Sequence, residues 1–242
     1  MKTAHIFAGS GGGLLADLIL GHTPIEAVEW DVQSCENLHA RSDWFPELQV
    51  HCADIRGFDA SSWKGRVDIL HAGIPCPKWS TARRGQGETY DGWSDTFRII
   101  QQAHPPIVFL ECVEAFKREH ERVRSDLDQA GYGISKPLVS DVASLGAPHS
   151  RRRYWAIGYS YNKGQSMCNF NAEMAILQAF DAGPWWENPP LPLGVDDGMA
   201  HRVYRFRATG NGQIPVQAAA AFLMLGGPLD MSAKEERRCG VR

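Results

Sequence analysis

Cys76, which two prolines flank, is the residue of this chain best suited to nucleophilic chemistry. It lies in the sequence Gly-Ile-Pro-Cys-Pro, directly after the apolar segment 67–72. This pattern predicts a buried strand that ends in a stiff turn. Such a turn can hold a thiol at the edge of an α/β sheet, where ligands bind. A lone cysteine is more often an inert core residue, so a catalytic role for Cys76 depends on the rest of the chain.

A glycine-rich turn, Phe-Ala-Gly-Ser-Gly-Gly-Gly at residues 7–13, follows the first apolar segment and precedes a helical pattern. Glycines let the backbone approach a ligand closely. Glu29 and Trp30 end the second apolar segment, and Asp54 and Ile55 follow the third. Glu29 could accept hydrogen bonds from a ribose, Trp30 could face a purine, and Asp54 could accept from an exocyclic amine. One nucleoside-bearing cofactor would satisfy all three, and the alternative is a ligand-free turn with solvated acids.

Five short motifs, in the same order along the chain, make this sequence resemble the cytosine-C5 DNA methyltransferases. The family patterns are Phe-x-Gly-x-Gly-Gly, Gly-x-Pro-Cys-Gln, Glu-Asn-Val, Gln-x-Arg-x-Arg and Gly-Asn. Each motif is short, but the ordered set is specific. The matching residues are Phe7, Gly9, Gly11 and Gly12; Gly73, Pro75 and Cys76; Glu111 and Val113; Arg151 and Arg153; and Gly210 and Asn211.

The resemblance implies covalent catalysis on cytosine. A thiolate, here Cys76, adds at C6 and makes C5 nucleophilic enough to take a methyl group. By resemblance Glu111 would face N3, a role that requires its pKa to be raised by burial or hydrogen bonding. Of Arg151 and Arg153, one contacts the cytosine O2 or a phosphate and the other supports the site. The implied methyl donor is S-adenosylmethionine, held by Phe7, Gly9, Ser10, Gly11, Gly12, Glu29, Trp30, Asp54, Ile55, Pro75 and Asn211.

A cytosine inside a duplex must be flipped out before a thiol can reach it, so the implied partner is double-stranded DNA. The long segment 75–93 is then a candidate lid. Its polar residues could contact phosphate or fill the vacated stack, although ordinary solvated charge also explains the two arginines. These residues are Ser80, Arg83, Arg84 and Gln86.

Four features depart from the family pattern. Pro77 stands in place of the Gln after the nucleophile, Cys112 in place of the Asn, and His149 in place of the Gln of the arginine motif. We expect Cys112 to alter tolerance for the donor or the base. The fourth departure is size, because only residues 159–211 remain for target recognition. This predicts short or relaxed sequence specificity, or help from a partner subunit.

The first two-thirds of the chain alternate short apolar segments with helical patterns. This alternation predicts parallel βαβ units in a doubly wound, mostly parallel α/β sheet. By resemblance the fold is the Rossmann-like fold of S-adenosylmethionine-dependent methyltransferases with a very small recognition segment. Expected strands are 4–8, 25–30, 49–53, 67–72, 107–112, 134–138 and 154–159, and expected helices are 13–20, 32–41, 94–103, 114–130 and 216–225, the last opened by Pro215.

We expect residues 1–160 and 198–230 to form the catalytic domain, 161–197 a target-recognition segment, and 231–242 a polar tail. In the recognition segment, Trp185 and Trp186 could stack on bases, although packing is the favoured interpretation.

The composition limits the setting of the protein. The 242 residues carry a net charge of −3, so phosphates would have to meet local basic patches. The six cysteines form no CxxC pair, which predicts reduced thiols, no metal and a cytoplasmic location, in the host cell if the protein is phage-encoded. No signal peptide and no apolar stretch near 18 residues is present, so we expect no membrane association.

Three other functions compete with this interpretation. Cytosine methylation of RNA, chiefly tRNA, fits the same catalytic motifs. A DNA-binding relative without turnover would fit the Cys112 substitution, but Cys76, Glu111 and both arginines are in place. A nicotinamide-dependent oxidoreductase would use the glycine turn but explains neither the Pro-Cys turn nor the arginines.

Overall fold

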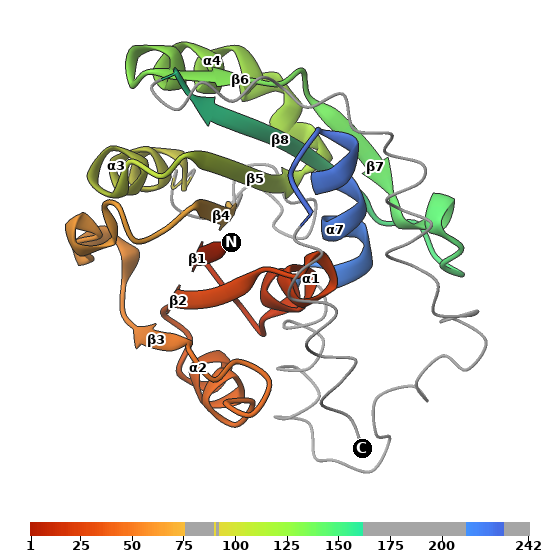
Figure 1. The fold of residues 1–242 in the computed structure, drawn as a ribbon. Coiled ribbons are helices and arrows are strands. Elements are labelled where there is room, and N and C mark those ends of the chain that lie inside the picture. Colours follow the sequence, from red (N-terminus) through yellow and green to blue (C-terminus); the bar gives the residue numbers. More distant parts are fainter. Residues whose placement is uncertain (76–89, 91, 162–211, 230–242) are drawn as a thin grey trace.

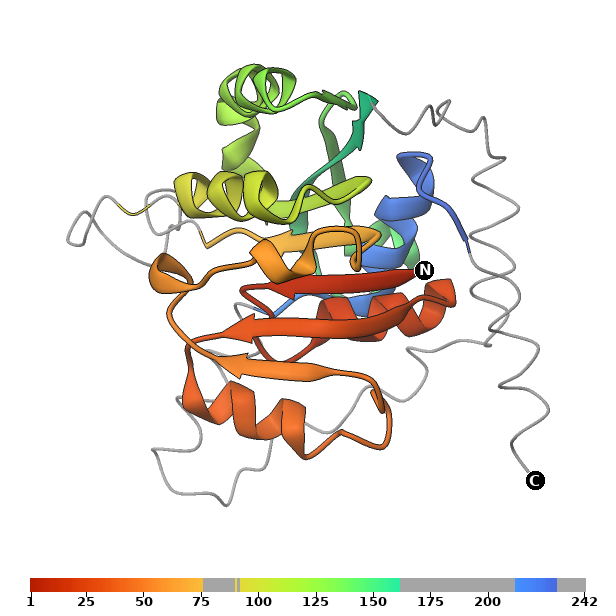
Figure 2. The ribbon, with the colours of Figure 1, turned by 60° about the vertical axis from the view of Figure 1, so that its left-hand side comes forward.

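The computed structural model describes residues 1–75, 90, 92–161 and 212–229. Within this part of the chain, a sheet of eight strands carries helices on both faces (Figures 1 and 2). None of the described helices is long and apolar enough to cross a membrane. The strands are β1 (Lys2–Ile6), β2 (Thr23–Glu29), β3 (Gln49–Cys52), β4 (Ile69–Gly73), β5 (Ile107–Val113), β6 (Tyr132–Ile134), β7 (Leu138–Asp141) and β8 (Arg152–Ser160). The α-helices are α1 (Gly12–Leu20), α2 (Val32–His39), α3 (Trp93–Ala103), α4 (His120–Gln129) and α7 (Pro215–Met224), and the 3-10 helices are η1 (Ile55–Gly57), η2 (Ser61–Trp63), η3 (Glu114–Glu119) and η4 (Val142–Leu145).

The strand order is β3-β2-β1-β4-β5-β8-β6, with β7 also paired to β8. Strands β1 to β5 are parallel, whereas β8 runs antiparallel to β5, β6 and β7. The predicted mostly parallel α/β sheet is therefore confirmed. The chain moves outward in opposite directions from β1 and β4, so the carboxyl ends of these two strands form the switch point where α/β sheets bind ligands.

Two predicted elements are wrong in detail. The expected strand 134–138 spans a break, because β6 ends at Ile134 and β7 begins at Leu138. Pro137 lies in this break, and a proline has no backbone N–H to donate to a strand ladder. The expected helix 114–130 is two elements, the 3-10 helix η3 and the α-helix α4. The apolar pattern alone did not distinguish these two geometries.

Two layers of apolar side chains cover the sheet. On one face α3 and α4 pack with side chains such as Ile99 and Leu127 against β1, β4 and β5. On the other face α1 and α7 lie side by side, with Ala16 and Phe222 in one cluster with Phe109 of β5 (Figure 1). Pro215 opens α7 at its first turn, as the sequence predicted.

A buried polar cluster fastens α1 to the sheet. The Asp17 carboxylate of α1 accepts hydrogen bonds from Thr3 Oγ1 at 2.5 Å and from His5 Nε2 at 2.6 Å. His22 Nδ1 lies 3.5 Å from the other oxygen. Burial raises the pKa of Asp17, but the two histidines outweigh it and hold that pKa well below its usual range. Burial lowers the pKa of the neighbouring His71 to about 3, so this imidazole is neutral.

The ligand atoms of His5, Asp17 and His71 lie within 4.8 Å of one another, a spacing that a metal ion could use. The short bond between His5 and Asp17 is, however, a complete hydrogen bond, and Asp17 has a third donor in Thr3. Asp17, His5 and Thr3 thus form a buried polar network, whereas His71 Nε2, also buried, has no hydrogen-bond partner in the described part of the chain.

Candidate active site

The predicted site residues that the structure describes gather at one edge of the sheet, where the parallel strands β1 to β5 end and the antiparallel strand β8 begins. Several lie outside the described residues and stay predictions. They are Cys76, Ser80, Arg83, Arg84, Gln86 and Asn211, together with residues 162–197 of the recognition segment and the tail 231–242.

The turn that leads to the expected nucleophile begins beside Glu111. Gly73 of β4 pairs with Glu111 of β5, and the next amide, Ile74 N, donates to the Glu111 carbonyl at 2.9 Å. Pro75 packs against Gly92, where an added Cβ would lie 2.9 Å from the proline ring. The chain is therefore fixed through Pro75, one residue before Cys76.

Glu111 has a partner on each carboxylate oxygen. Arg153 Nε lies 3.0 Å from Oε1, and Gln213 Nε2 donates to Oε2 at 3.2 Å. The residue is 7% exposed, and this burial raises its pKa. The charges of Arg153 and Arg151 and the hydrogen bond from Gln213 oppose that rise without cancelling it. A carboxyl in this state retains a proton at a higher pH than a solvated glutamate does.

Arg151 holds the segment that precedes α7. Its Nη2 donates to the Gly212 carbonyl at 2.5 Å, and its own amide donates to Asp141. Burial and the nearby Arg153 charge lower its pKa to about 10, with Glu111 opposing. Arg153 therefore pairs with Glu111 directly, whereas Arg151 acts on it only through its nearby charge.

The glycines of the turn differ in what surrounds them. A Cβ at Gly9 would meet nothing within 4 Å, and Gly9 has a φ of +53°. A Cβ at Gly11 would lie 2.8 Å from the Leu38 side chain, and one at Gly12 only 2.1 Å from the Gln213 carbonyl oxygen. Gly9 thus leaves open backbone for a ligand, whereas Gly11 and Gly12 make room for α2 and for the chain before α7.

Glu29, which the sequence predicts to bind a ribose, holds the glycine turn in the structure. Its carboxylate accepts from Gly9 N at 2.7 Å and from the amides of Trp30 and Asp31 at 3.0 and 2.9 Å. These bonds connect the end of β2 to the end of β1. Trp30, immediately after it, exposes 65% of its surface, which is unusual for so large an apolar ring.

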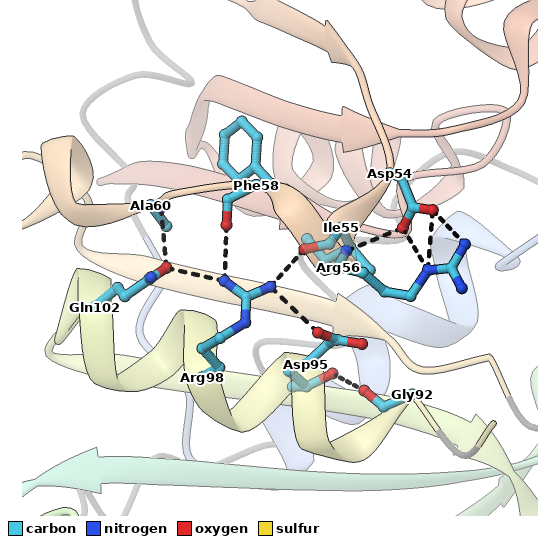
Figure 3. A network of polar contacts seen from close by, with 10 residues as sticks. Asp54, Ile55, Arg56, Phe58, Ala60, Gly92, Asp95, Arg98 and Gln102 are labelled. Carbon is cyan, nitrogen blue, oxygen red and sulfur yellow. Dashed lines mark hydrogen bonds and ion pairs between the residues drawn. The ribbon is translucent and has the colours of Figure 1, made fainter.

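The turn after β3 is held by α3. Asp54 pairs with Arg56 through Oδ2 at 2.5 Å and caps η1, so its carboxylate has a cation beside it (Figure 3). That arginine lowers the pKa of Asp54. Arg98 of α3 donates to the carbonyls of Ile55 at 2.5 Å and Phe58 at 2.7 Å (Figure 3).

The described residues fit a nucleoside-bearing cofactor. Gly9 gives open backbone, Trp30 gives an exposed ring, and Glu29 gives a nearly buried carboxylate at the end of the adjacent strand. These three features lie together because β1 and β2 are paired in parallel.

Two residues of the site were missed from the sequence. Gln213 is two positions after the Gly-Asn motif, and nothing in its type or spacing indicated a contact with Glu111. Arg98 lies in an amphipathic helix, where an arginine usually marks the solvent side. No neighbouring residue in the sequence indicated either contact, because both side chains hydrogen-bond to segments far away along the chain.

Cys112 is buried, and its Sγ lies 3.3 Å from the Ile74 carbonyl. It is disulfide-bonded, so the expectation of reduced thiols throughout is wrong at this position. Cys35 and Cys52 are free. Cys112, which stands where the family pattern has Asn, therefore contacts the turn that leads to Cys76.

Comparisons with known proteins agree with this geometry. Type II methyltransferase M.HpaII of Haemophilus parainfluenzae is 30% identical over 188 residues, which are 72% of this chain and 50% of that protein. M.CviJI of Paramecium bursaria Chlorella virus IL3A is 28% identical over 229 residues, 91% of this chain and 58% of the relative. The chain thus spans about half the length of these curated relatives.

Solved structures share the fold. DNMT2 of Spodoptera frugiperda superposes with a TM-score of 0.55 at 19% identity, over 70% of this chain and 52% of that one. A putative DNA modification methyltransferase encoded within a prophage (E. coli) superposes with a TM-score of 0.53 at 22% identity, over 67% of this chain and 47% of that one. The family model of the C-5 cytosine-specific DNA methylases matches residues 1–181. With three-quarters of its length in that match and the acid and arginine motifs brought together at one sheet edge, the chain belongs to the C-5 cytosine-specific DNA methylase family.

Proposed function

We propose that this protein methylates C5 of cytosine in double-stranded DNA, with Cys76 as nucleophile and S-adenosylmethionine as methyl donor. One observation supports this most strongly. The backbone that leads to Cys76 is hydrogen-bonded to Glu111, from Ile74 N to the Glu111 carbonyl, so the thiol-bearing turn starts at the acid expected to face the base.

In the proposed reaction the Cys76 thiolate forms a bond to C6 of an extrahelical cytosine. The electron pair of the C5–C6 double bond moves through the ring, and Glu111 gives its proton to N3. C5 then forms a bond to the methyl group as the bond between that methyl group and the donor sulfur breaks, and the donor leaves as a neutral thioether. A base removes the C5 proton, N3 returns its proton to Glu111, and the S–C6 bond breaks to restore the ring and the thiolate.

Each described residue has a task in this scheme. Burial raises the pKa of Glu111 and so favours its protonated form, and Arg153 fixes the orientation of its carboxyl group. The bound donor supplies an electrophilic methyl group. Gly9, Glu29 and Trp30 would hold its nucleoside, with Phe7, Ser10, Gly11, Gly12, Asp54, Ile55, Pro75 and Asn211 completing the proposed set.

The full chain, incubated with the donor and duplex DNA that contains 5-fluorocytosine, tests this proposal. Fluorine cannot leave as a proton does, so the Cys76–C6 bond is trapped and a denaturant-stable complex is expected. Cys76→Ser should give none, and Cys52→Ser, at an exposed free thiol, serves as the matched control. If DNA gives no adduct while fluorocytosine-containing tRNA does, the substrate is RNA; if neither does, the protein is a binding relative without turnover.

We further propose that sequence specificity is short or relaxed, or is completed by a partner subunit. Bisulfite sequencing of DNA from an expressing host should show methylation at a consensus of fewer than four fixed positions. A longer consensus from this chain acting alone would contradict relaxed specificity. The lid roles of Ser80, Arg83, Arg84 and Gln86 belong to the same proposal and predict weaker DNA binding when they are replaced together.

A further inference from the structure

Gln213 lies between the start of α1, the end of β4 and Glu111 of β5. Its carbonyl oxygen is 2.1 Å from where a Cβ of Gly12 would lie. Its side-chain Oε1 is 2.7 Å from the Cβ position of Gly13, and its Nε2 is 2.9 Å from that of Gly73. Gln213 thus packs against three glycines, Gly12 and Gly13 at the start of α1 and Gly73 at the end of β4, where a side chain would collide with it.

The segment around Gln213 is held from both sides. The preceding carbonyl, of Gly212, accepts from Arg151, and the following carbonyl, of Ile214, accepts from Ala218 in the first turn of α7. These bonds hold the backbone of Gln213, and its side chain packs between Gly13, Gly73 and Glu111. Its amide therefore meets the Glu111 carboxyl in a defined geometry, at 3.2 Å.

We propose that Gln213 is a positioning residue, whose amide fixes the Oε2 oxygen of Glu111 and ties that carboxyl group to the glycine turn of the donor site. This deepens the proposed function and rests on it, because it assumes that Glu111 is the acid that meets cytosine. Arg153 fixes the other oxygen, so the two partners together prevent rotation of the carboxyl group.

The amide also bears on the protonation of Glu111. An N–H that donates to a carboxylate favours its ionised form. Among the described residues, Arg153 and Arg151 also lower the pKa of this carboxyl group. The residue of β4 that pairs with Glu111 is Gly73, which has no charge. Burial opposes all of them and raises the pKa. Removal of the amide should therefore raise the pKa of Glu111 further.

The first test measures Glu111 without using activity. The full chain carries glutamate labelled with carbon-13 at the side-chain carboxyl, and the Glu111 resonance is the one that Glu111→Gln removes. Gln213→Met, which keeps the length of the side chain but has no amide, should raise the titration midpoint by about one pH unit. An unchanged midpoint in a folded Gln213→Met protein overturns the proposal.

Gln217→Met is the matched control. Gln217 is a buried glutamine one turn further on, and its amide donates to Ser140 and to the Arg151 carbonyl. Its replacement removes more side-chain hydrogen bonds than that of Gln213 and should still leave the Glu111 midpoint in place. Equal shifts in both variants would show a general loosening and would also overturn the proposal.

Wild-type protein provides a measurement that does not depend on the folding of a variant. The side-chain amide resonances of Gln213 should shift with pH at the same midpoint as Glu111, and independent behaviour overturns the proposal. The fluorocytosine adduct distinguishes failure of the proposed function from failure of the role of Gln213. If Gln213 and Glu111 titrate together but no adduct forms, only the proposed function is rejected. An adduct without coupled titration rejects the role of Gln213 alone.

Discussion

Gly12 is a position where a glycine can be required for two reasons, ligand binding and packing. The motif implies that it brings backbone close to a cofactor, and its own neighbour in the structure is the Gln213 carbonyl. Gly9, two residues before Gly11, faces open space and has the left-handed φ that favours glycine. A single pattern in the sequence thus combines glycines kept for a ligand with glycines kept for packing.

Gly12→Ala should destabilise the protein and loosen the segment before α7. The added Cβ would lie 2.1 Å from a backbone oxygen, which cannot rotate away. We expect a loss of about 1–3 kcal/mol in the free energy of unfolding, measured with urea. Gly57→Ala is the control, because a Cβ there meets nothing within 4 Å. Equal stability of the two variants would contradict this account.

Helix α3 supports the turn after β3, which carries two residues of the proposed donor site. Arg98 donates to the carbonyls of Ile55 and Phe58, which belong to the turn after β3 that carries Asp54 (Figure 3). Gln102, one turn along the same helix, accepts from the Ala60 amide. The turn is therefore positioned by a helix that follows it in sequence by about forty residues.

Arg98→Met should weaken S-adenosylmethionine binding, because the turn that bears Asp54 and Ile55 loses two hydrogen bonds from a charged donor. Bonds of this kind are worth about 1.5–3 kcal/mol each, and partial loss corresponds to roughly a tenfold rise in Kd by calorimetry. Arg124→Met, at an exposed pair with Glu121 on α4, is the control and should bind normally. Unaltered affinity in a folded Arg98→Met protein would refute this role.

The molecule as a whole depends on buried charge as well as on apolar layers. Asp17 joins α1 to β1 through Thr3 and His5, with His22 beside it, in an environment without solvent. Since α7 packs on α1, this cluster also supports the helix that follows Gln213. Loss of one member leaves other buried polar groups without partners, which is costly.

Asp17→Asn should lower the free energy of unfolding by about 3 kcal/mol at pH 7. Because the pKa of Asp17 is lower in the folded protein than in the unfolded chain, its contribution is present above the unfolded value, about 3.9, and is lost as the pH falls below it. Urea unfolding at pH 7 and pH 3 should thus show a smaller difference between wild type and variant at pH 3. The same difference in the free energy of unfolding at both pH values would contradict the charge network. Glu121→Gln, which removes one partner of an exposed ion pair, is the control and should change the free energy of unfolding little.

Many of the strands and helices could be predicted from the sequence, because apolar segments and prolines are local features of the chain. Apolar segments such as 67–72 and 107–112 coincide closely with β4 and β5, and Pro215 marks the start of α7. The break at Pro137 and the 3-10 geometry of η3 were missed, since both depend on hydrogen bonds that an apolar pattern does not encode.

The sequence by itself determined the chemistry of the site: a proline-flanked thiol, a glycine turn, two acids after strands, and Glu111 with a pair of arginines, all in one family's order. Only the tertiary structure decided which of these residues meet. It placed Arg153 and Gln213 on opposite oxygens of Glu111, paired Asp54 with Arg56, and gave Gly12 a packing role. The reason is physical, because residue type fixes what a side chain can do, whereas its partners and pKa are set by distant segments that fold against it.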